Sequence, residues 1–224
     1  MKEKVVQVKT KRMVLQPMSD EEIQRMIETS EDVELCQAYG EMLAGCRADP
    51  QNRIWYAPWK MAAKSDGVYL GDLGFKGPAQ NHAVEIGYGI LPEYEGQGYT
   101  TEAVQAMIQW AFGQEDVIFV EAESAPDNGA SQHILEKCGF VPDGTGEEGP
   151  RFVLENPLPN WKTIYMLFGI SIGTALGSSF GTVGVGLSLG LCLGLCIGAA
   201  LDASAKKERD KVIKKREEHR QGNR

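Results

Sequence analysis

The stretch VEIGYGILPEYEGQGYTTEAV, residues 84–104, combines a strand pattern, a glycine-rich turn and the start of a helix. The turn is Gly96-Gln97-Gly98, and the apolar spacing of a helix begins shortly after it. Such a turn leaves backbone N–H groups free and places a helix N-terminus beside them. Because both features attract anions, the stretch predicts a site for a phosphorylated ligand.

Three interpretations of this turn need to be separated. A dinucleotide fingerprint requires a third glycine, but Thr101 stands in its place and hairpin strands precede the turn, which argues against this interpretation without excluding it. A P-loop is excluded because no Gly-Lys-Ser/Thr follows. An ordinary glycine-rich turn without a ligand is the third interpretation.

The elements around the turn follow from the spacing of apolar residues. Alternation between turn residues predicts strands at 11–17, 54–64, 68–75, 82–91, 117–123 and 151–155. Helical spacing predicts helices at 19–27, 33–46, 101–113 and 131–137. The first helix opens with a capping box between Ser19 and Glu22. Hairpin strands come first and a strand–helix–strand unit follows, which predicts an α+β domain with a mixed sheet.

The composition changes abruptly at the end of this domain, which we expect to span residues 1–156. Pro157, Pro159 and Trp161 mark a linker over residues 157–162. No charged residue occurs from Thr163 to Leu201. As a single helix this stretch would be nearly twice as long as the hydrocarbon core of a bilayer is thick.

Glycines give the uncharged stretch a regular pattern. They stand at every fourth position in two runs, 169–181 and 186–198. On a helix this spacing makes a smooth side along which two backbones approach closely. We therefore expect a hairpin of two helices, roughly 164–180 and 184–201, that turns near Gly181–Thr182 and places residues 163–202 in a membrane.

The charges are divided unevenly along the chain. The formal net charge is −8, but residues 203–224 hold nine Lys/Arg against four Asp/Glu, which leaves 14 basic and 27 acidic residues elsewhere. The acidic body attracts cationic amines, and the basic tail favours the cytoplasmic side of a membrane. A solvated charged helix is the alternative for this tail, whose mixed charges do not favour nucleic acid as a partner.

The cysteines and the N-terminus exclude two further classes. The five cysteines are odd in number and no Cys/His set has zinc spacing, so we expect reduced thiols and no bound metal. No apolar run follows Met1-Lys-Glu-Lys4, so no signal peptide is expected.

Four segments, taken in order, resemble the GNAT acetyltransferases, and most of all the branch of RimJ/RimL-type ribosomal-protein N-terminal acetyltransferases. They are Trp55-Tyr-Ala-Pro-Trp59, Gly74-Phe-Lys-Gly-Pro78, the stretch from Val84 to Ala103, and Asn128 with Ser131 and Leu135-Glu-Lys-Cys-Gly-Phe140. The resemblance covers about residues 5–155. It implies a GNAT fold, with a mixed, mostly antiparallel central sheet flanked by helices, before the glycine-rich hairpin and a charged C-terminal helix.

The resemblance also implies a ligand, acetyl-CoA, and the residues that bind it. The backbone of the turn would grip the pyrophosphate through six residues: Gly96, Gln97, Gly98, Tyr99, Thr100 and Thr101. The backbone near Ile90 and Leu91 would pair with the pantetheine arm, and Asn128 would reach it from the last strand–helix junction. Glu95 departs from the Gln or Arg usual in the family, and Thr100 from the usual Gly or Ala.

Acetyl transfer to an amine requires a group that removes the proton of the amine. Glu85 lies mid-strand on the face of Gly87 and Gly89, whose missing side chains leave room for an acyl group. It matches the strand carboxylate that is the general base in some GNAT enzymes, and a solvated glutamate is the alternative. The tyrosine acid of many members is replaced by Leu135, so no general acid is assigned. Three aromatic residues either pack in the core or line the acceptor pocket: Trp55, Tyr56 and Trp59.

The sequence thus predicts an acetyl-CoA-dependent N-acetyltransferase that acts on a primary amine, either a peptide N-terminus or a small amine. Residues 163–202 would tether it to the cytoplasmic face of the membrane, with both chain ends in the cytoplasm. Glycine stripes also pack helices between chains, so a homo-oligomer is expected as well. Two alternatives stay open: a membrane-associated assembly protein that binds CoA without catalysis, and a soluble glycine-zipper bundle.

Overall fold

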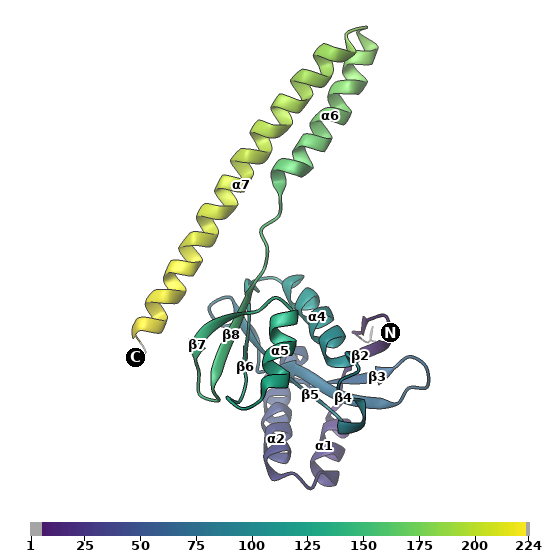
Figure 1. The fold of residues 1–224 in the computed structure, drawn as a ribbon, viewed down its shortest axis with the longest axis vertical. Coiled ribbons are helices and arrows are strands. Elements are labelled where there is room, and N and C mark those ends of the chain that lie inside the picture. Colours follow the sequence, from purple (N-terminus) through teal and green to yellow (C-terminus); the bar gives the residue numbers. More distant parts are fainter. Residues whose placement is uncertain (1–5, 223–224) are drawn as a thin grey trace. The chain divides into compact units, whose positions relative to one another are not determined.

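The computed structural model describes residues 6–222, and the side chains of residues 6–218. The chain divides into two compact units, Met1–Asn156 and Pro157–Arg224. The first unit contains the sheet and helices α1 to α5, and the second contains the helices α6 and α7 (Figure 1).

The first unit is built on one mixed sheet. The strand order is β1-β2-β3-β4-β5-β6-β8-β7, and β5–β6 is the parallel pair among otherwise antiparallel neighbours. The strands are Val8–Lys9, Met13–Pro17, Trp59–Ala63, Tyr69–Phe75, Ala83–Ile90, Phe119–Glu123, Val141–Thr145 and Pro150–Glu155, numbered β1 to β8 in chain order. A dinucleotide fold needs a largely parallel sheet, so this topology rules out that interpretation of the turn.

The helices of the first unit, except α3, begin within two residues of their predicted starts. They are α1 (Asp20–Thr29), α2 (Val33–Ala48), α3 (Arg53–Tyr56), α4 (Tyr99–Phe112) and α5 (Gly129–Lys137), with 3₁₀ turns at Pro50–Asn52 and Pro92–Tyr94. The capping box is present, since Ser19 accepts from the Glu22 N–H and the Glu22 carboxylate accepts from the Ser19 N–H. The α+β prediction is therefore confirmed.

Two local predictions were wrong. The strand expected at 54–64 begins only at Trp59, because the 3₁₀ turn at Pro50 continues into α3 and Pro58 then forces its neighbour Ala57 to be extended. Strand β7 was not expected, because Pro142 and Gly144 break its pattern and most of its residues are exposed.

The sheet has two different faces. Helices α4 and α5 cover one face with a large core that includes Trp59, Phe75, Val104 and Leu135. Helices α1 and α2 pack on the other through a smaller core around Ile23, Tyr39 and Leu43. We call this second side the α2 face. Residues that alternate along β5 divide between the two, so Glu85, Gly87 and Gly89 lie on the α2 face.

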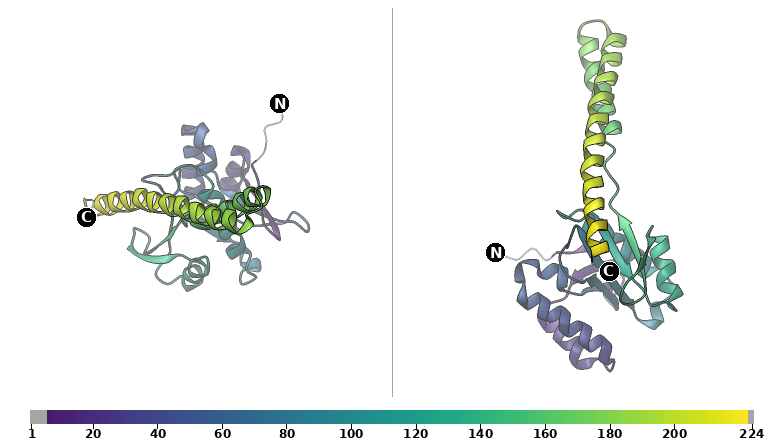
Figure 2. Two further views of the ribbon diagram at one scale, coloured as in Figure 1. Left: turned by 90° about the horizontal axis from the view of Figure 1, so that it is seen from above. Right: turned by 90° about the vertical axis from the view of Figure 1, so that its left-hand side faces the viewer.

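The second unit is a helical hairpin. Helix α6 (Trp161–Ser179) and helix α7 (Val183–Gly222) lie side by side in Figure 1, and Figure 2 shows the same hairpin from two other directions. The chain reverses at Gly181, which has a φ of +68°, and the Thr182 N–H donates to the Gly177 carbonyl. The predicted turn near Gly181–Thr182 is thus where the structure has it.

The glycine stripe lies between the two helices. A Cβ atom on Gly173 would come within 2.2 Å of the Gly186 carbonyl oxygen, and one on Gly169 within 2.1 Å of the Gly190 oxygen. The same holds near the hairpin base, where a Cβ on Gly198 would lie 2.5 Å from the Lys162 Cα. Only glycine permits this approach, because a real Cβ essentially never comes so close to backbone atoms.

The second helix is longer than predicted. The expected helix 184–201 and the charged tail form one continuous α7 of 40 residues, because the alanine- and lysine-rich segment after Gly198 contains no helix breaker. Among the described residues, the segment Val183–Glu218 is the helix long and apolar enough to cross a membrane by length and composition. Helix α6 does not meet the same criterion of length and apolar composition.

Candidate active site

The glycine-rich turn presents unused backbone amides at the start of α4. Gly96 and Gly98 have φ values of +68° and +76°, a region that side chains other than glycine rarely adopt. Gly98 is the N-cap residue and has no side chain, so no side-chain cap occupies the first amides of the helix. Open space surrounds Gly96, and a Cβ there would meet nothing within 4 Å. The turn therefore has the geometry of an anion site.

The side chains of the turn leave this amide cluster clear. The Gln97 side chain folds back and donates to the Glu93 carbonyl at 3.0 Å, so Gln97 offers its backbone. Glu95 is exposed, and its N–H donates to the Pro92 carbonyl. Thr100 is buried, with 6% of its surface exposed. None of these side chains fills the space in front of the helix N-terminus, which leaves room for a ligand.

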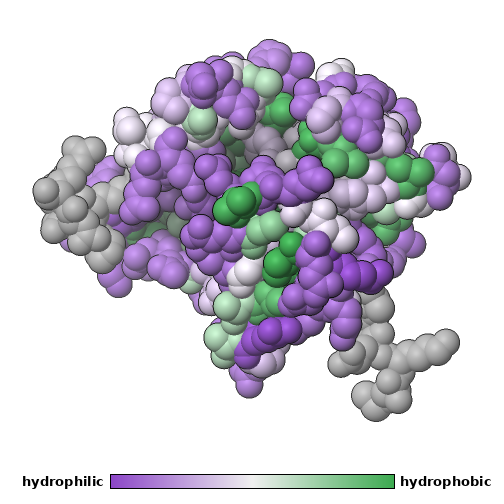
Figure 3. Space-filling view, turned by 90° about the horizontal axis from the view of Figure 1, so that it is seen from below, coloured by the Kyte–Doolittle hydropathy of each residue, from purple (hydrophilic) through white to green (hydrophobic). Residues whose placement is uncertain are grey.

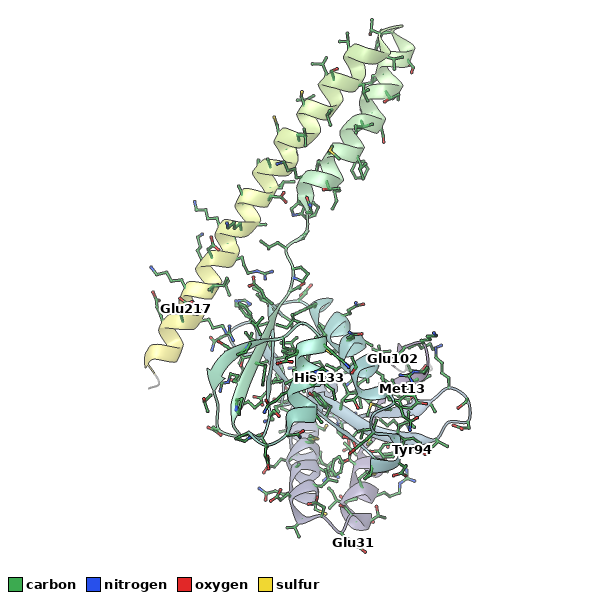
Figure 4. All side chains as sticks on the ribbon, viewed as in Figure 1. Met13, Glu31, Tyr94, Glu102, His133 and Glu217 are labelled. Atoms are coloured by element: carbon green, nitrogen blue, oxygen red, sulfur yellow. The ribbon has the colours of Figure 1, made fainter. Side chains whose placement is uncertain are left out.

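Arg12 contacts the turn, although it lies 85 positions before Gln97 in the sequence. Its backbone N–H and its Nε both bind the Glu102 carboxylate, at 2.8 and 2.7 Å, and its Nη1 donates to the Gln97 carbonyl at 2.9 Å. Its guanidinium also lies 4.1 Å from the centre of the Tyr99 ring, a cation–π contact. Glu102 and Met13, the neighbour of Arg12, are labelled close together in Figure 4. Arg12 thus ties β2 to the first turn of α4.

The charge of Glu102 is stabilised by these contacts. Burial alone would raise the pKa of Glu102, but hydrogen bonds from Thr10 and Arg12, together with the charge of Arg12, lower it to about 2. Sequence analysis did not identify Arg12, because its partner Glu102 lies 90 residues away and no local pattern marks the pair.

Strands β5 and β6 separate in the middle of the sheet. Their parallel pairing covers Ala83 to Glu85 and ends at the Glu85–Glu121 pair, whereas β5 continues to Ile90 along β4. The Lys76 N–H donates to the Glu85 carbonyl and the Leu91 N–H to the Leu70 carbonyl, so these odd-numbered residues of β5 bond to β4. By alternation, the backbone groups of Ile90 point to the side where β6 has left.

Glu85 is held in a chain of ion pairs on the α2 face. Lys76 Nζ lies 2.6 Å from Glu85 Oε1 and 2.7 Å from Glu148 Oε1. Burial lowers the pKa of Lys76, but the bonds to Glu148 and Glu85 outweigh it and raise the pKa, which keeps Lys76 charged. Gly87 and Gly89 next to Glu85 are exposed, with nothing within 4 Å of a Cβ at either position. A carboxylate beside an open strip of backbone is thus present where the sequence predicts it.

The loop that carries Glu148 is itself fixed to the sheet. Arg151 binds Glu123 Oε1 through Nε and Nη2, at 3.0 and 2.8 Å, and the Glu148 N–H donates to Glu123 Oε2 at 2.9 Å. A Cβ on Gly146 would overlap the Glu123 carboxyl group, so a larger residue at 146 would have to displace the Glu123 side chain from its bonds to Arg151 and Glu148. The pair Lys76–Glu148 therefore has a fixed anchor.

Asn128 has a structural contact of its own. It is the N-cap of α5, and its Oδ1 accepts from the Ser131 N–H at 3.0 Å, while the residue stays exposed. Ser131 in turn bonds the Tyr88 hydroxyl at 3.0 Å, which connects α5 to β5. The cap uses Oδ1, so the side-chain amide group of Asn128 is what it offers to a ligand.

Trp55, Tyr56 and Trp59 were expected either to pack in the core or to line the acceptor pocket, and they differ in this respect. Trp59 is fully buried, and Trp55 packs against Phe75 and Trp110 with ring centres 5.1 and 4.9 Å apart, so both take the core alternative. Tyr56 lies on the α2 side, where its ring fills the space next to Gly45 and Gly77, and its place in an acceptor pocket stays a prediction.

Helix α5 carries His133 and also Leu135, the residue at the position of the family's tyrosine acid. His133 is exposed on α5 (Figure 4), with 64% of its side chain accessible. Leu135 is fully buried in the core. Within the described residues, no group of three or more His, Cys, Asp or Glu side chains is placed to hold a metal ion.

Comparisons with known proteins agree with this geometry. The family model described as "Acetyltransferase (GNAT) domain" matches residues 7–141, and the one described as "Glycine zipper membrane protein" matches residues 167–208. The uncharacterized N-acetyltransferase YjdG of Bacillus subtilis is 37% identical over 84 residues, which are 37% of this chain and 50% of YjdG. The putative ribosomal N-acetyltransferase YdaF of the same organism is 35% identical over 69 residues, 31% of this chain and 38% of YdaF. The chain thus spans about half the length of the curated relatives it matches.

Solved structures match over nearly their whole length. The ribosomal-protein-S5-alanine acetyltransferase of Vibrio fischeri superimposes with a TM-score of 0.55 at 15% identity, over 70% of this chain and 99% of that one. A ribosomal L7/L12 α-N-protein acetyltransferase, RimL, solved with coenzyme A, gives the same TM-score and identity over 67% of this chain and 98% of its own. At this identity the likeness shows the fold, and the predicted fold class is confirmed.

Proposed function

The chain belongs to the GNAT acetyltransferase family, and on this premise we propose that it transfers the acetyl group of acetyl-CoA to a primary amine while its hairpin tethers it to the cytoplasmic face of a membrane. The observation that carries the enzymatic part is the uncapped N-terminus of α4 behind Gly96 and Gly98. The RimL structure that shares this fold was solved with coenzyme A, which supports the choice of ligand.

The turn would bind the pyrophosphate through its backbone. The space next to Gly96 is open, the first amides of α4 carry no side-chain cap, and the positive end of the α4 dipole adds to their attraction for an anion. Arg12 holds the turn in shape by binding the Gln97 carbonyl. Glu95 is exposed, so its carboxylate does not have to face the phosphates.

The pantetheine arm would lie in the opening between β5 and β6. The backbone groups of Ile90 point into this opening, whereas the Leu91 N–H is already bound to Leu70, so pairing with the arm falls to Ile90. Asn128, the N-cap of α5 in the segment that follows β6, would donate to the arm from its amide group.

Glu85 would act as the general base. The amine nitrogen attacks the thioester carbonyl, a C–N bond forms, the C–S bond breaks, and the amine loses a proton to Glu85. Lys76 binds Oε1, so the proton would go to Oε2, and the ion pair with Lys76 limits the movement of the carboxylate. CoA leaves as a thiolate that takes its proton from water, since thiolates of pKa about 8.5 are tolerable leaving groups.

Binding and catalysis are tested separately on the full chain in detergent micelles. Acetyl-CoA binding is measured by calorimetry, and turnover by thiol release across a panel of primary amines. Binding without release on any amine would support the assembly-protein alternative and contradict the transferase. Absence of binding would contradict both.

Glu85→Gln tests the base. We expect a fall in kcat of roughly 100-fold, the scale of general-base catalysis, with an unchanged Kd for acetyl-CoA. Glu148→Gln is the matched control, since it removes the other carboxylate bound to Lys76 and lies outside the proposed base. Equal rates for wild type and Glu85→Gln would remove the assigned role.

The tether rests on the apolar exterior of the hairpin. Large apolar side chains of the hairpin are exposed, and Phe168, Ile172, Leu189 and Leu193 line a groove between its two helices. No charged residue occurs from Thr163 to Leu201, and the match to the glycine zipper membrane family lies here. The basic tail after Ala203 favours the cytoplasmic side. Fractionation with and without residues 163–201 tests this, and an equally soluble full chain would contradict it.

A further inference from the structure

The α2 face carries a second carboxylate, Asp72, which has no part in the proposed acetyl transfer. Asp72 of β4 accepts hydrogen bonds through Oδ2 from two tyrosine hydroxyls, those of Tyr39 on α2 and of Tyr69 at the start of β4. Burial and the charge of Asp72 raise the pKa of both tyrosines, so both hydroxyls stay protonated and act as donors. Asp72 is therefore the acceptor of both hydrogen bonds. No local sequence pattern marks this residue.

A β-bulge makes this arrangement. Met61 of β3 faces Gly71, but the next residue, Ala62, faces Tyr69, so β4 holds one extra residue here. Gly71 has a φ of +148°, and a Cβ there would lie 2.4 Å from the Gly89 carbonyl oxygen. The bulge turns Tyr69 to the same face as Asp72, which regular alternation would prevent. Bulges that redirect a side chain are frequent next to active sites.

Asp72 has no cationic partner among the described residues. Lys60 lies opposite it on β3 but binds Glu22 of α1 instead. Burial raises the pKa of Asp72 and outweighs the hydrogen bonds from Tyr39 and Tyr69, which lower it, and no basic side chain contributes. Both hydroxyls use Oδ2, and no buried side-chain oxygen in the described part of the chain lacks a partner, so Oδ1 is reachable from outside. A partly buried carboxylate without a counter-charge is stabilised in its ionised form when a cation binds beside it.

The position of Asp72 connects it to the proposed acetyl-transfer site. Its neighbour across the sheet is Gly89, and Gly87 follows two residues away on the same face. Nothing fills the space above either glycine. Beyond β5 lies the opening left by β6, where the thioester would end. Since neighbouring strands are about 5 Å apart, Asp72 lies on the order of 5–10 Å from that opening across bare backbone.

From these contacts we infer that Asp72, held by Tyr39 and Tyr69, binds a second positive charge of the acceptor, so that the enzyme prefers diamines and other polycationic amines over monoamines of equal length. This rests on the proposed transferase function and narrows its acceptor. The acidic composition of residues 1–156, with 13 Lys/Arg against 26 Asp/Glu, attracts such substrates from solution.

The test compares 1,4-diaminobutane with n-butylamine on the full chain. Wild type should show a kcat/KM at least tenfold higher for the diamine, and Asp72→Asn should remove that preference through KM, while kcat/KM for n-butylamine and the Kd of acetyl-CoA stay unchanged. Asn keeps an oxygen that accepts from the tyrosines, so the fold is preserved. A purely structural role would instead lower the values for both amines together.

Two controls isolate the charge of Asp72. Asp66→Asn removes an exposed acid from the same hairpin and should keep the preference. Tyr39→Phe removes one donor but keeps the charge, so it should keep the preference as well. Equal use of both amines by wild type, or the same loss with Asp66→Asn, overturns the inference while the transferase stands.

The inference is decided even if no amine is acetylated. Binding of 1,4-diaminobutane to the protein saturated with CoA is then measured by calorimetry. Binding at least tenfold weaker in Asp72→Asn supports the site although the transferase fails, and equal binding by both proteins overturns it.

Discussion

The N-termini of α4 and α6 differ in how their first backbone amides are bonded. Helix α4 starts at Gly98, which has no side chain, so no side-chain cap occupies its first amides. Helix α6 starts after Asn160, whose Oδ1 accepts from the Thr163 N–H, and Asp202 of α7 accepts from the N–H groups of Trp161 and Lys162. An uncapped N-terminus beside a glycine turn leaves its amides available to an anionic ligand, whereas the amides of α6 are already used within the hairpin.

The surroundings of the glycines also differ between the two units. In the first unit, Gly87, Gly89 and Gly96 border empty space. In the hairpin, the space in front of Gly173 and Gly190 is filled by the backbone of the partner helix. The hydrophilic surface in Figure 3, with its small and separate hydrophobic patches, also differs from the uncharged exterior of residues 163–201. Glycine alone therefore does not identify a site, and what occupies its missing side chain does.

Gly98→Val changes the uncapped N-terminus of α4 and should have the largest effect of the variants. A β-branched residue at a φ of +76° is strained and distorts the amides that the ligand needs. We expect acetyl-CoA to bind at least ~100-fold more weakly, the loss of about 3 kcal/mol, measured by calorimetry. Gly67→Val is the matched control, because Gly67 has the same φ of +76° and open surroundings in a hairpin turn. Equal loss of binding in both variants would mean that strain, rather than the site, is responsible.

Gly173→Leu should break the packing of the two hairpin helices. Its Cβ would lie 2.2 Å from the Gly186 carbonyl oxygen, so the two helices have to separate. We expect the distance between spin labels at the exposed positions Leu167 and Leu193 to increase by several ångströms, roughly the width of a side chain. Gly184→Leu adds the same side chain to the same hairpin where nothing lies within 4 Å, and its spectrum should match wild type.

Local signals explain what the sequence predicted. The capping box of α1, the turn at Gly181 and the strand–turn–helix at 84–104 each depend on residues within a few positions of one another. The contacts that were missed join distant residues. Arg12 binds Glu102 across 90 positions, Tyr39 binds Asp72 across 33, and Asp202 caps Trp161 across 41. Spacing rules do not reach such distances, because only the fold brings these residues together. The site roles given to Glu85 and residues 96–101 stay predictions until a ligand is bound.

Glu102→Gln should weaken the turn and change its response to acid. The folded pKa of Glu102 is about 2, below its ordinary value of 4.5. The ion pair with Arg12 therefore contributes full stability above pH 4.5 and loses it as the pH falls toward 2. We expect the variant to be about 1 kcal/mol less stable at pH 7 and to lose less stability between pH 4.5 and 2 than wild type, measured by chemical denaturation. Parallel pH profiles for the two proteins would contradict this role.

Asp202→Asn should have the smallest effect and sharpens the comparison of the two N-termini. Asp202 accepts from the Trp161 N–H through Oδ1 and from the Lys162 N–H through Oδ2, so the asparagine keeps an acceptor for one of them and loses the negative charge beside the α6 dipole, which is worth about 0.5–1 kcal/mol. Hydrogen exchange of the Trp161 and Lys162 amides should therefore accelerate roughly threefold, and Asp210→Asn, an exposed acid on the same helix, should leave it unchanged. The amides of Tyr99 and Thr100 supply the contrast in the same experiment, because only acetyl-CoA should slow their exchange. If those amides exchange slowly without the ligand, α4 is already capped within the protein, and the distinction between a binding terminus and an architectural one fails.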